Sequence, residues 1–179
     1  MPDVGSPALD LWTQAQKEFS ARDYDRAADL LARLVAQHPD DPGLKMQSVR
    51  LQYGITLLRL RRTEEGVVQL RLAVKLDPSN PRAHQKLGAG LARLGKDAEA
   101  LPYFEHAAAV VRDNAEYQWR VGEQYRRLGH LQAARAAFER CLALDPDYRY
   151  AAEGLAVLAK TERSRLAPLA RAIRRALRG

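Results

Sequence analysis

The residues of this chain that could do chemistry are few and scattered. The single cysteine, Cys141, excludes an intramolecular disulfide and cannot provide a cluster of thiolate ligands. The sequence contains no glycine-rich phosphate loop, no HExxH motif and no GxSxG motif. The four histidines occupy unrelated positions: His38, His84, His106 and His130. We therefore expect no metal site and no cofactor, and we predict that the protein is not an enzyme.

Three arginines with a regular spacing are better candidates for binding a ligand. Arg59, Arg93 and Arg127 recur at one constant interval along the chain. A guanidinium group presents a planar fork of donors that matches a carboxylate. Two interpretations remain open, because the three groups could bind an acidic ligand or could simply be solvated.

The spacing of these arginines is also the period of most of the chain, about 34 residues. Gly54, Gly88 and Gly122 recur at the same interval, in the strings LQYGITLLRL, QKLGAGLARLG and WRVGEQYRRLG. One repeat upstream the step is longer, which five extra residues, Pro42 to Met46, explain. Three further series share the period: Gly66, Ala100 and Ala134; Leu70, Phe104 and Phe138; Ala73, Ala107 and Cys141.

Each repeat has the pattern of two antiparallel helices. Two apolar stripes at helical spacing are separated by a turn such as LGKD and closed by a segment such as LDPSN. A lone hairpin cannot bury both faces, so several hairpins must stack into an all-α solenoid. We expect Pro42 and Leu44 to lengthen the first helix of the second repeat. We further expect nine helices up to Lys160, a tenth beyond it, and no strand.

The pattern resembles the tetratricopeptide repeat family, which places small and bulky residues at fixed positions of a helical hairpin. The matching repeats run over 8–41, 47–80, 81–114 and 115–148, after a flexible N-terminus at 1–7 and before a capping helix at 149–160. The fourth repeat matches best, through Gly122, Tyr125, Gly129, Ala134, Phe138, Cys141 and Pro146. The resemblance implies a right-handed superhelical solenoid of stacked antiparallel helix pairs.

The resemblance also implies a function, because solenoids of this family bind a peptide or protein segment in a concave groove lined by the first helices. We therefore expect a protein-interaction scaffold, such as an adaptor, an assembly factor or a co-chaperone-like component, in the cytoplasm. Carried over from the family, the groove residues are Trp12, Gln16, Leu51, Ile55, Arg59, Arg82, Lys86, Arg93, Trp119, Glu123, Arg126 and Arg127.

The chemistry of these groove residues changes along the chain. The N-terminal half is apolar and aromatic, whereas the C-terminal half is polar and basic, so a ligand with an apolar end and an acidic end would match. Trp12 and Trp119 are candidate hot spots, although Trp12 could equally close the end of the core. Some family members hold a terminal carboxylate through a basic clamp. Of the matching positions only Arg82 and Lys86 are basic here, so we do not expect a true clamp.

The basic character of the chain is concentrated at its C-terminal end. The net charge is +7, and residues 160–179 account for +6 of it. The remaining chain gives no reason to expect specific binding of nucleic acid. Residues 161–179 are predicted to form a basic amphipathic helix, whose arginines include Arg171, Arg174, Arg175 and Arg178.

Two fates of this C-terminal helix are open. Its apolar stripe could pack against the end of the solenoid, with the arginines in water. Alternatively, the helix could attach the solenoid to an anionic membrane, a polyanion or an acidic partner. The lack of tryptophan and phenylalanine in the stripe weakens the membrane version.

Overall fold

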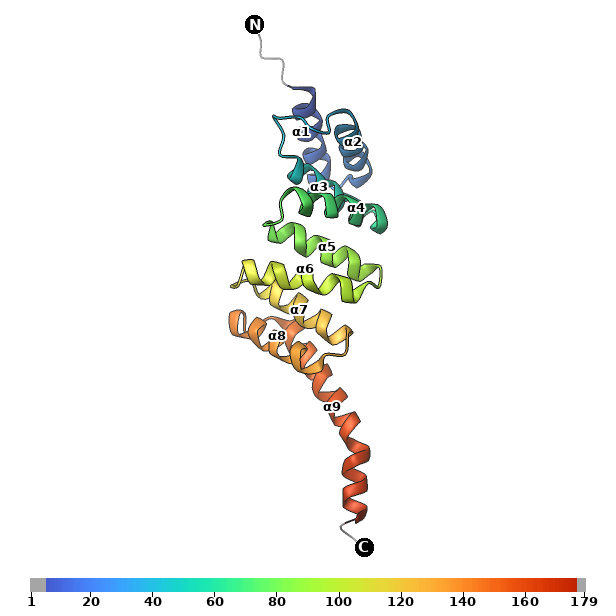
Figure 1. Cartoon of the computed structure of the whole chain (residues 1–179), viewed down its shortest axis with the longest axis vertical. Coiled ribbons are helices and arrows are strands. Elements are labelled where there is room, and N and C mark those ends of the chain that lie inside the picture. The colour runs from blue at the N-terminus through green and yellow to red at the C-terminus, as the bar shows by residue number, and fades with distance from the viewer. Residues whose placement is uncertain (1–5, 177–179) are drawn as a thin grey trace. The chain divides into compact units, whose positions relative to one another are not determined.

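The computed structural model describes residues 6–176, and within this range the chain forms nine α-helices and no strand (Figure 1). The predicted all-α class is confirmed. The helices are α1 (Pro7–Ser20), α2 (Tyr24–Gln37), α3 (Met46–Arg59), α4 (Thr63–Leu76), α5 (Pro81–Arg93), α6 (Asp97–Val110), α7 (Ala115–Arg127), α8 (Leu131–Leu144) and α9 (Arg149–Ala176).

Helices that follow each other in the chain pack as hairpins, each matching one predicted repeat. The pairs are α1 with α2, α3 with α4, α5 with α6, and α7 with α8. The chain comprises two compact units, Met1–Val110 and Val111–Gly179. Within the first unit, α3 packs on α2 and α5 packs on α4. Within the second unit, α9 packs on α7 and α8. Each unit is thus a stack of helical hairpins, as the period predicts.

Turn and cap residues explain where several helices begin and end. The side chain of Asn80 accepts a hydrogen bond from the amide of Ala83 at 3.1 Å, and so caps the N-terminus of α5. Asn114 caps α7 in the same way. Between α7 and α8 the chain turns through Gly129 at a φ of 79°, whereas Arg61 takes this left-handed conformation, at 62°, between α3 and α4.

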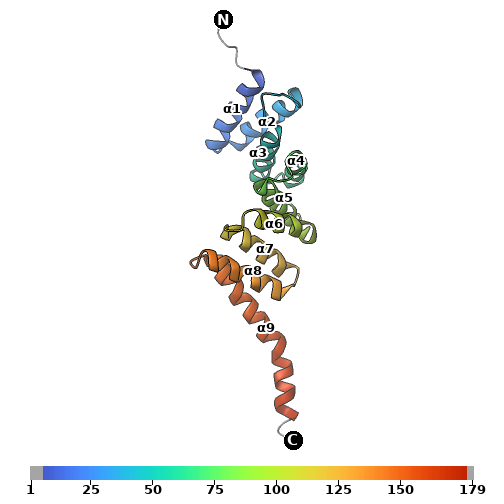
Figure 2. The same cartoon turned by 60° about the vertical axis from the view of Figure 1, so that its left-hand side comes forward.

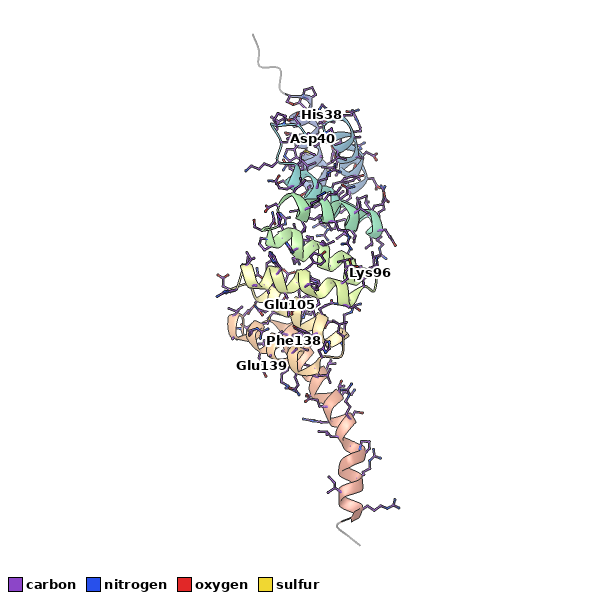
Figure 3. The ribbon with its side chains drawn as sticks, viewed as in Figure 1. His38, Asp40, Lys96, Glu105, Phe138 and Glu139 are labelled. Atoms are coloured by element: carbon purple, nitrogen blue, oxygen red, sulfur yellow. The ribbon has the colours of Figure 1, made fainter. Side chains whose placement is uncertain are left out.

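Small residues on first helices face bulky residues on second helices, which is how each hairpin closes. A Cβ added to Gly54 would lie 2.5 Å from Leu70, and one added to Gly122 would lie 2.6 Å from Phe138. A Cβ added to Gly154 on α9 would lie 2.6 Å from the other edge of the same Phe138 ring. Phe138, labelled in Figure 3, is therefore fully buried between α7 and α9. The predicted pairing of small and bulky residues is confirmed.

The five-residue insertion does not lengthen a helix, and the prediction made for it is wrong. Helix α3 begins at Met46, and the preceding residues form a turn. The Asp41 carboxylate accepts a hydrogen bond from the Gly43 amide at 2.8 Å, which offers the backbone an alternative to the helix. Leu44 packs against the core of α1 to α3. The insertion is thus a surface turn anchored by one apolar side chain.

The expected break at Lys160 is also absent. Helix α9 runs without interruption from Arg149 to Ala176, so no tenth helix begins within the described residues. Pro168 lies inside it, but the helix continues past this position. Figure 2 shows the C-terminal half of α9 extending beyond α7 and α8 of its unit. One 28-residue helix therefore replaces the predicted capping helix and separate C-terminal helix.

The two halves of α9 have different surroundings. In the first half Ala151 and Leu158 are buried against the second unit's core. In the second half Leu166 is 60% exposed and Ile173 is 52% exposed. For these two residues the expectation that the stripe packs against the end of the solenoid is wrong. None of the described helices combines the length and the apolar character needed to cross a bilayer.

Candidate binding surfaces

The predicted groove residues of the first unit all lie on first helices, but several are occupied in holding the fold. Leu51 and Ile55 on α3 are only 8% and 6% exposed. Trp12 on α1 is half-buried and packs against the core of α1 to α3. Gln16, on the same helix, is exposed. The aliphatic part of the predicted groove is therefore mostly core.

The arginines of the first unit differ in what they contact. On α5, Arg93 donates a hydrogen bond from Nη1 to the carbonyl oxygen of Leu58 at 2.9 Å. This carbonyl belongs to the last turn of α3, where helical carbonyls lack intrahelical partners and a cation is favoured. Arg59 and Arg82 are exposed, and Lys86 is half-buried. Because Arg127 belongs to the second unit, the alignment of all three periodic arginines stays a prediction.

The second unit carries an aromatic cluster made of Trp119, Tyr148 and Tyr150. The ring of Trp119 on α7 lies 6.0 Å from Tyr148 and 5.6 Å from Tyr150, measured between centroids. The two tyrosine rings are 6.2 Å apart. These distances are those of favourable aromatic pairs. Tyr150, in the first turn of α9, is 60% exposed, so the cluster presents an aromatic surface to solvent.

Charged groups around the aromatic cluster are largely paired with one another. The guanidinium carbon of Arg120 lies 4.6 Å from the centroid of the Trp119 ring, in cation–π geometry. Arg120 also forms an ion pair with Glu116 at 3.1 Å. On the same helix Arg126 donates two hydrogen bonds to the carboxylate of Glu123, at 2.8 and 2.6 Å, which raises the pKa of Arg126. This face is therefore less basic than its composition suggests.

Tyr150 was not among the predicted groove residues, although the repeat could have revealed it. It lies one full period after Glu116, the second residue of the fourth repeat. The register assigns that position to the groove, but the predicted groove covers only the four complete repeats. Extending the period into the capping helix would have placed Tyr150 beside Trp119.

Cys141 lies beneath this face and has the character of a core residue. It is fully buried in the second unit. Burial, followed by the charge of Asp145, raises the pKa of its thiol to about 11. The thiolate, which is the nucleophile and the metal ligand, is therefore scarce at neutral pH. The sequence interpretation of Cys141 as a buried packing residue is confirmed.

Two of the four histidines, which are far apart in the sequence, contact each other in the structure. His84 on α5 and His106 on α6 stack with centroids 3.9 Å apart. Nε2 of His84 donates to the carbonyl of Pro78 at 2.8 Å, and burial lowers the pKa of His84. Among the described residues, no group of three or more His, Cys, Asp or Glu side chains could hold a metal ion.

Of the four arginines predicted for the basic C-terminal helix, the structure describes the side chains of Arg171 and Arg175. Arg171 donates from Nε to the carbonyl of Ala167 at 3.3 Å, within its own helix, and Arg175 is exposed. The side chain of Arg174 and the whole of Arg178 lie outside the described part of the chain.

Comparisons with known proteins agree with the repeat pattern. Residues 115–148 and residues 9–41 match sequence models of the tetratricopeptide repeat. No curated protein sequence matches the chain.

Several solved structures share the fold. A structure of MamA is 18% identical, with a TM-score of 0.76, over 83% of this chain and 84% of that one. MamA from Desulfovibrio magneticus RS-1 is 22% identical, with a TM-score of 0.73, over 89% and 97%. YrrB, described as a TPR protein with an unusual peptide-binding site, is 19% identical, with a TM-score of 0.76, over 86% and 76%. At such identities the likeness concerns the fold alone.

Proposed function

The chain is a member of the tetratricopeptide repeat family, and we propose on this basis that it is a scaffold that binds a segment of another protein. The peptide-binding site described for YrrB supports this proposal by analogy of fold. The protein acts as an adaptor, an assembly factor or a co-chaperone-like component and carries out no reaction of its own. A cytoplasmic location accords with its unpaired cysteine.

The observation that carries the proposal is the aromatic cluster on the second unit. Tyr150 is more than half exposed and lies beside Trp119, whose ring is also in cation–π contact with Arg120. Rigid aromatic side chains offer a large contact area at a low cost in conformational entropy, and they are enriched at binding hot spots. The paired charges around the cluster form a polar rim of the kind that surrounds such hot spots.

The chemistry of the partner follows from these side chains. A partner segment places an apolar or aromatic side chain against Trp119 and Tyr150. An acidic portion of the partner is favoured by the exposed arginines on first helices, Arg127 in the second unit and Arg59 and Arg82 in the first. Gln16 and Lys86 are secondary candidates, since Gln16 is exposed and Lys86 is half-buried on the same set of helices.

The experiment compares three single variants of the full chain in calorimetric titrations with a partner segment recovered by pull-down. Tyr150→Ala and Trp119→Ala should each cost about 2 kcal/mol of binding free energy, roughly a 30-fold loss of affinity. Leu144→Ala, which removes an exposed apolar side chain from α8, is the control and should bind normally. Because Trp119 also touches the core, Tyr150→Ala is the decisive variant. Unchanged affinity in both aromatic variants would exclude this face as the binding site.

A further inference from the structure

Helix α9 has the register of a first helix, but within the described residues no second helix follows it. In every complete repeat the first helix packs against the second helix that follows it. Within the described residues α9 packs only on α7 and α8, which precede it. It is also 28 residues long, whereas the eight other helices have 13 or 14. Figure 3 shows side chains projecting from its C-terminal half with no second helix beside them.

The repeat register identifies the face that a second helix would cover. Gly122 on α7 is buried against Phe138 of its own second helix. The residue one period later is Ala156, which is exposed. Beside it Ala152 is exposed as well, and Leu155 is only half-buried. These residues have the size and apolar character of a hairpin interface. Leu155 packs in part against the core of the second unit, whereas Ala152 and Ala156 remain exposed.

The same apolar face continues along the second half of α9. Residues spaced by three, four and seven positions share one side of a helix, as in the seam of a coiled coil. On this side lie Ala152, Leu155, Ala159, Leu166 and Ile173, which we call the α9 seam. Leu166 and Ile173 are both more than half exposed. Glu162 lies on the same side, between Ala159 and Leu166, where it is paired with Arg135. The apolar residues on either side of it fit another helix with heptad spacing.

The charge beside the seam points to the kind of helix that fits. From Lys160 to Ala176 there are six basic residues and one acidic residue, Glu162. Arg135 on α8 already holds Glu162 through an ion pair of 2.6 Å. A second copy of this helix would bring arginines against arginines, which like-charge repulsion disfavours. With Leu166 and Ile173 at a positions, Arg163 and Arg165 take the e and g positions beside the seam, so a helix with acidic flanks would gain complementary pairs there.

The surroundings of the seam favour a helix over a lipid surface. A cleft of about 750 Å³ opens between the start of α8 and α9, lined by Leu131, Arg135, Arg165 and Leu166, among others. Leu166 thus belongs to both the cleft and the seam. A hollow of this kind accepts side chains from a helix, whereas a bilayer surface is broad and flat. The near half of the seam is also made mostly of alanines, which allow two helices to approach closely but contribute little to insertion into lipid.

We propose that the α9 seam binds an amphipathic α-helix with acidic flanks, supplied by a partner protein in the place that a second helix occupies in the complete repeats. This site is separate from the aromatic cluster. About four and a half helical turns separate Tyr150 from Leu166, which places the two on opposite sides of α9. The two binding proposals can therefore fail independently.

The test uses the full chain and a synthetic amphipathic helix as the probe. The peptide has about three heptads, with leucine at a and d and glutamate at e and g, and its control carries lysine at e and g. The glutamate peptide should bind more weakly as salt is added, and the lysine peptide should not bind. The double variant Leu166→Gln, Ile173→Gln should lower the affinity at least tenfold. Because both side chains are exposed, this variant should keep the helical circular dichroism of the wild type.

Two further variants separate shape from charge. Val157→Gln changes a side chain that is 47% exposed on the side of α9 opposite to Leu166, and should leave the affinity unchanged. The double reversal Arg163→Glu, Arg165→Glu, at the e and g positions that flank the seam, should abolish binding of the glutamate peptide and allow binding of the lysine peptide. Such a switch is not expected if the peptide adheres to the chain through apolar contacts alone.

Several outcomes would overturn the proposal. One is failure of the glutamate peptide to bind the wild-type chain. Another is wild-type affinity in the Leu166→Gln, Ile173→Gln variant. Binding to vesicles of phosphatidylcholine and phosphatidylserine that this variant loses, without peptide binding, would identify a lipid surface as the occupant. A dimer detected by sedimentation and lost in the same variant would identify a second copy.

Discussion

The two units place different kinds of residue at the same repeat positions. In the first unit the predicted groove residues Leu51 and Ile55 are buried, and Arg93 holds the end of a neighbouring helix. In the second unit Trp119 and Tyr150 remain at the surface as part of an aromatic cluster. The repeat register therefore predicts which side of a helix a residue occupies, but it does not predict how exposed that residue is.

The composition of the first helices explains the difference. Helix α3 is apolar on nearly all sides, as expected for a helix that packs against neighbours on several faces. Its buried residues are Val49, Leu51, Tyr53, Gly54, Ile55, Thr56, Leu57 and Leu58. Helix α7 carries charged or amide side chains at many of the matching positions. Its face toward solvent stays polar, and the aromatic cluster stands out against it. A binding surface is thus easier to recognise in the second unit.

The largest effect should come from the ring that holds the second unit together. Phe138→Ala should cost about 3–5 kcal/mol of unfolding free energy, because Phe138 is fully buried and fills the space between Gly122 and Gly154. Urea denaturation followed by circular dichroism measures this loss. Leu144→Ala, an exposed position on the same helix, should change stability by less than about 0.5 kcal/mol. Equal effects of the two substitutions would contradict the assigned core.

The next prediction tests the comparison between the units directly. Ile55→Ala in the first unit should cost about 2–4 kcal/mol of stability, because the side chain is buried and its removal leaves a cavity. Tyr150→Ala in the second unit should leave stability nearly unchanged, since the ring is mostly exposed, but should weaken partner binding. The measurements are urea denaturation and calorimetric titration of both variants. The comparison fails if Ile55→Ala lowers affinity as much as Tyr150→Ala does in chains that remain folded.

Much of the fold could be predicted from the sequence because the period is carried by steric pairs. A small residue recurs in each repeat opposite a leucine or phenylalanine, and it is glycine in the second to fourth repeats. This pairing permits few arrangements other than a closed hairpin, as Gly54 with Leu70 and Gly122 with Phe138 show. Such pairs are local and do not depend on the rest of the molecule. For this reason the hairpins and most helix limits agree with the pattern.

Features outside the period were harder to predict. Pro42 is compatible with a first turn, so the sequence favours a helix in the insertion before α3, but the Asp41 side chain stabilises a competing turn. The continuation of α9 past Lys160 depends on a long run of helix-forming residues in a segment without a partner helix. His84 and His106 occupy different repeat positions, and only the packing of α5 on α6 brings them together. Local side-chain chemistry and helix propensity thus decided the first two outcomes, and tertiary packing decided the third.

A smaller effect should separate the arginines of the first unit. Arg93→Ala should cost about 1 kcal/mol of stability, because it removes a charge-assisted hydrogen bond to the carbonyl of Leu58 that solvent only partly screens. Arg59→Ala, at an exposed position of α3, should cost less than about 0.5 kcal/mol. Chemical denaturation of the two variants measures the difference. If the two costs were equal, the hydrogen bond of Arg93 would not contribute to the stability of the fold. Arg93 would then be a candidate only for contact with a ligand.

The smallest predicted effect concerns the histidine pair, a feature of the first unit with no counterpart among the described residues of the second. Burial lowers the pKa of His84, and the charge of nearby His106 acts in the same direction. The Pro78 carbonyl and Asp77 oppose the shift. Because His84 donates through Nε2, protonation would add a hydrogen at Nδ1, a buried atom with no hydrogen-bond partner among the described residues. Folding therefore favours the neutral imidazole.

The sign of the pH dependence follows from this preference. Above the ordinary histidine pKa of about 6.5 the contribution of His84 to stability is complete. As the pH falls below that value the unfolded chain takes up the proton more readily than the folded chain, so stability declines. Melting temperatures of the wild type should be lower at pH 5.5 than at pH 7.5 (about one unit on either side of that pKa). In His84→Gln, which keeps a donor for Pro78, the decline should be smaller. An identical decline in both proteins would show that the pKa of His84 does not differ between the folded and the unfolded chain.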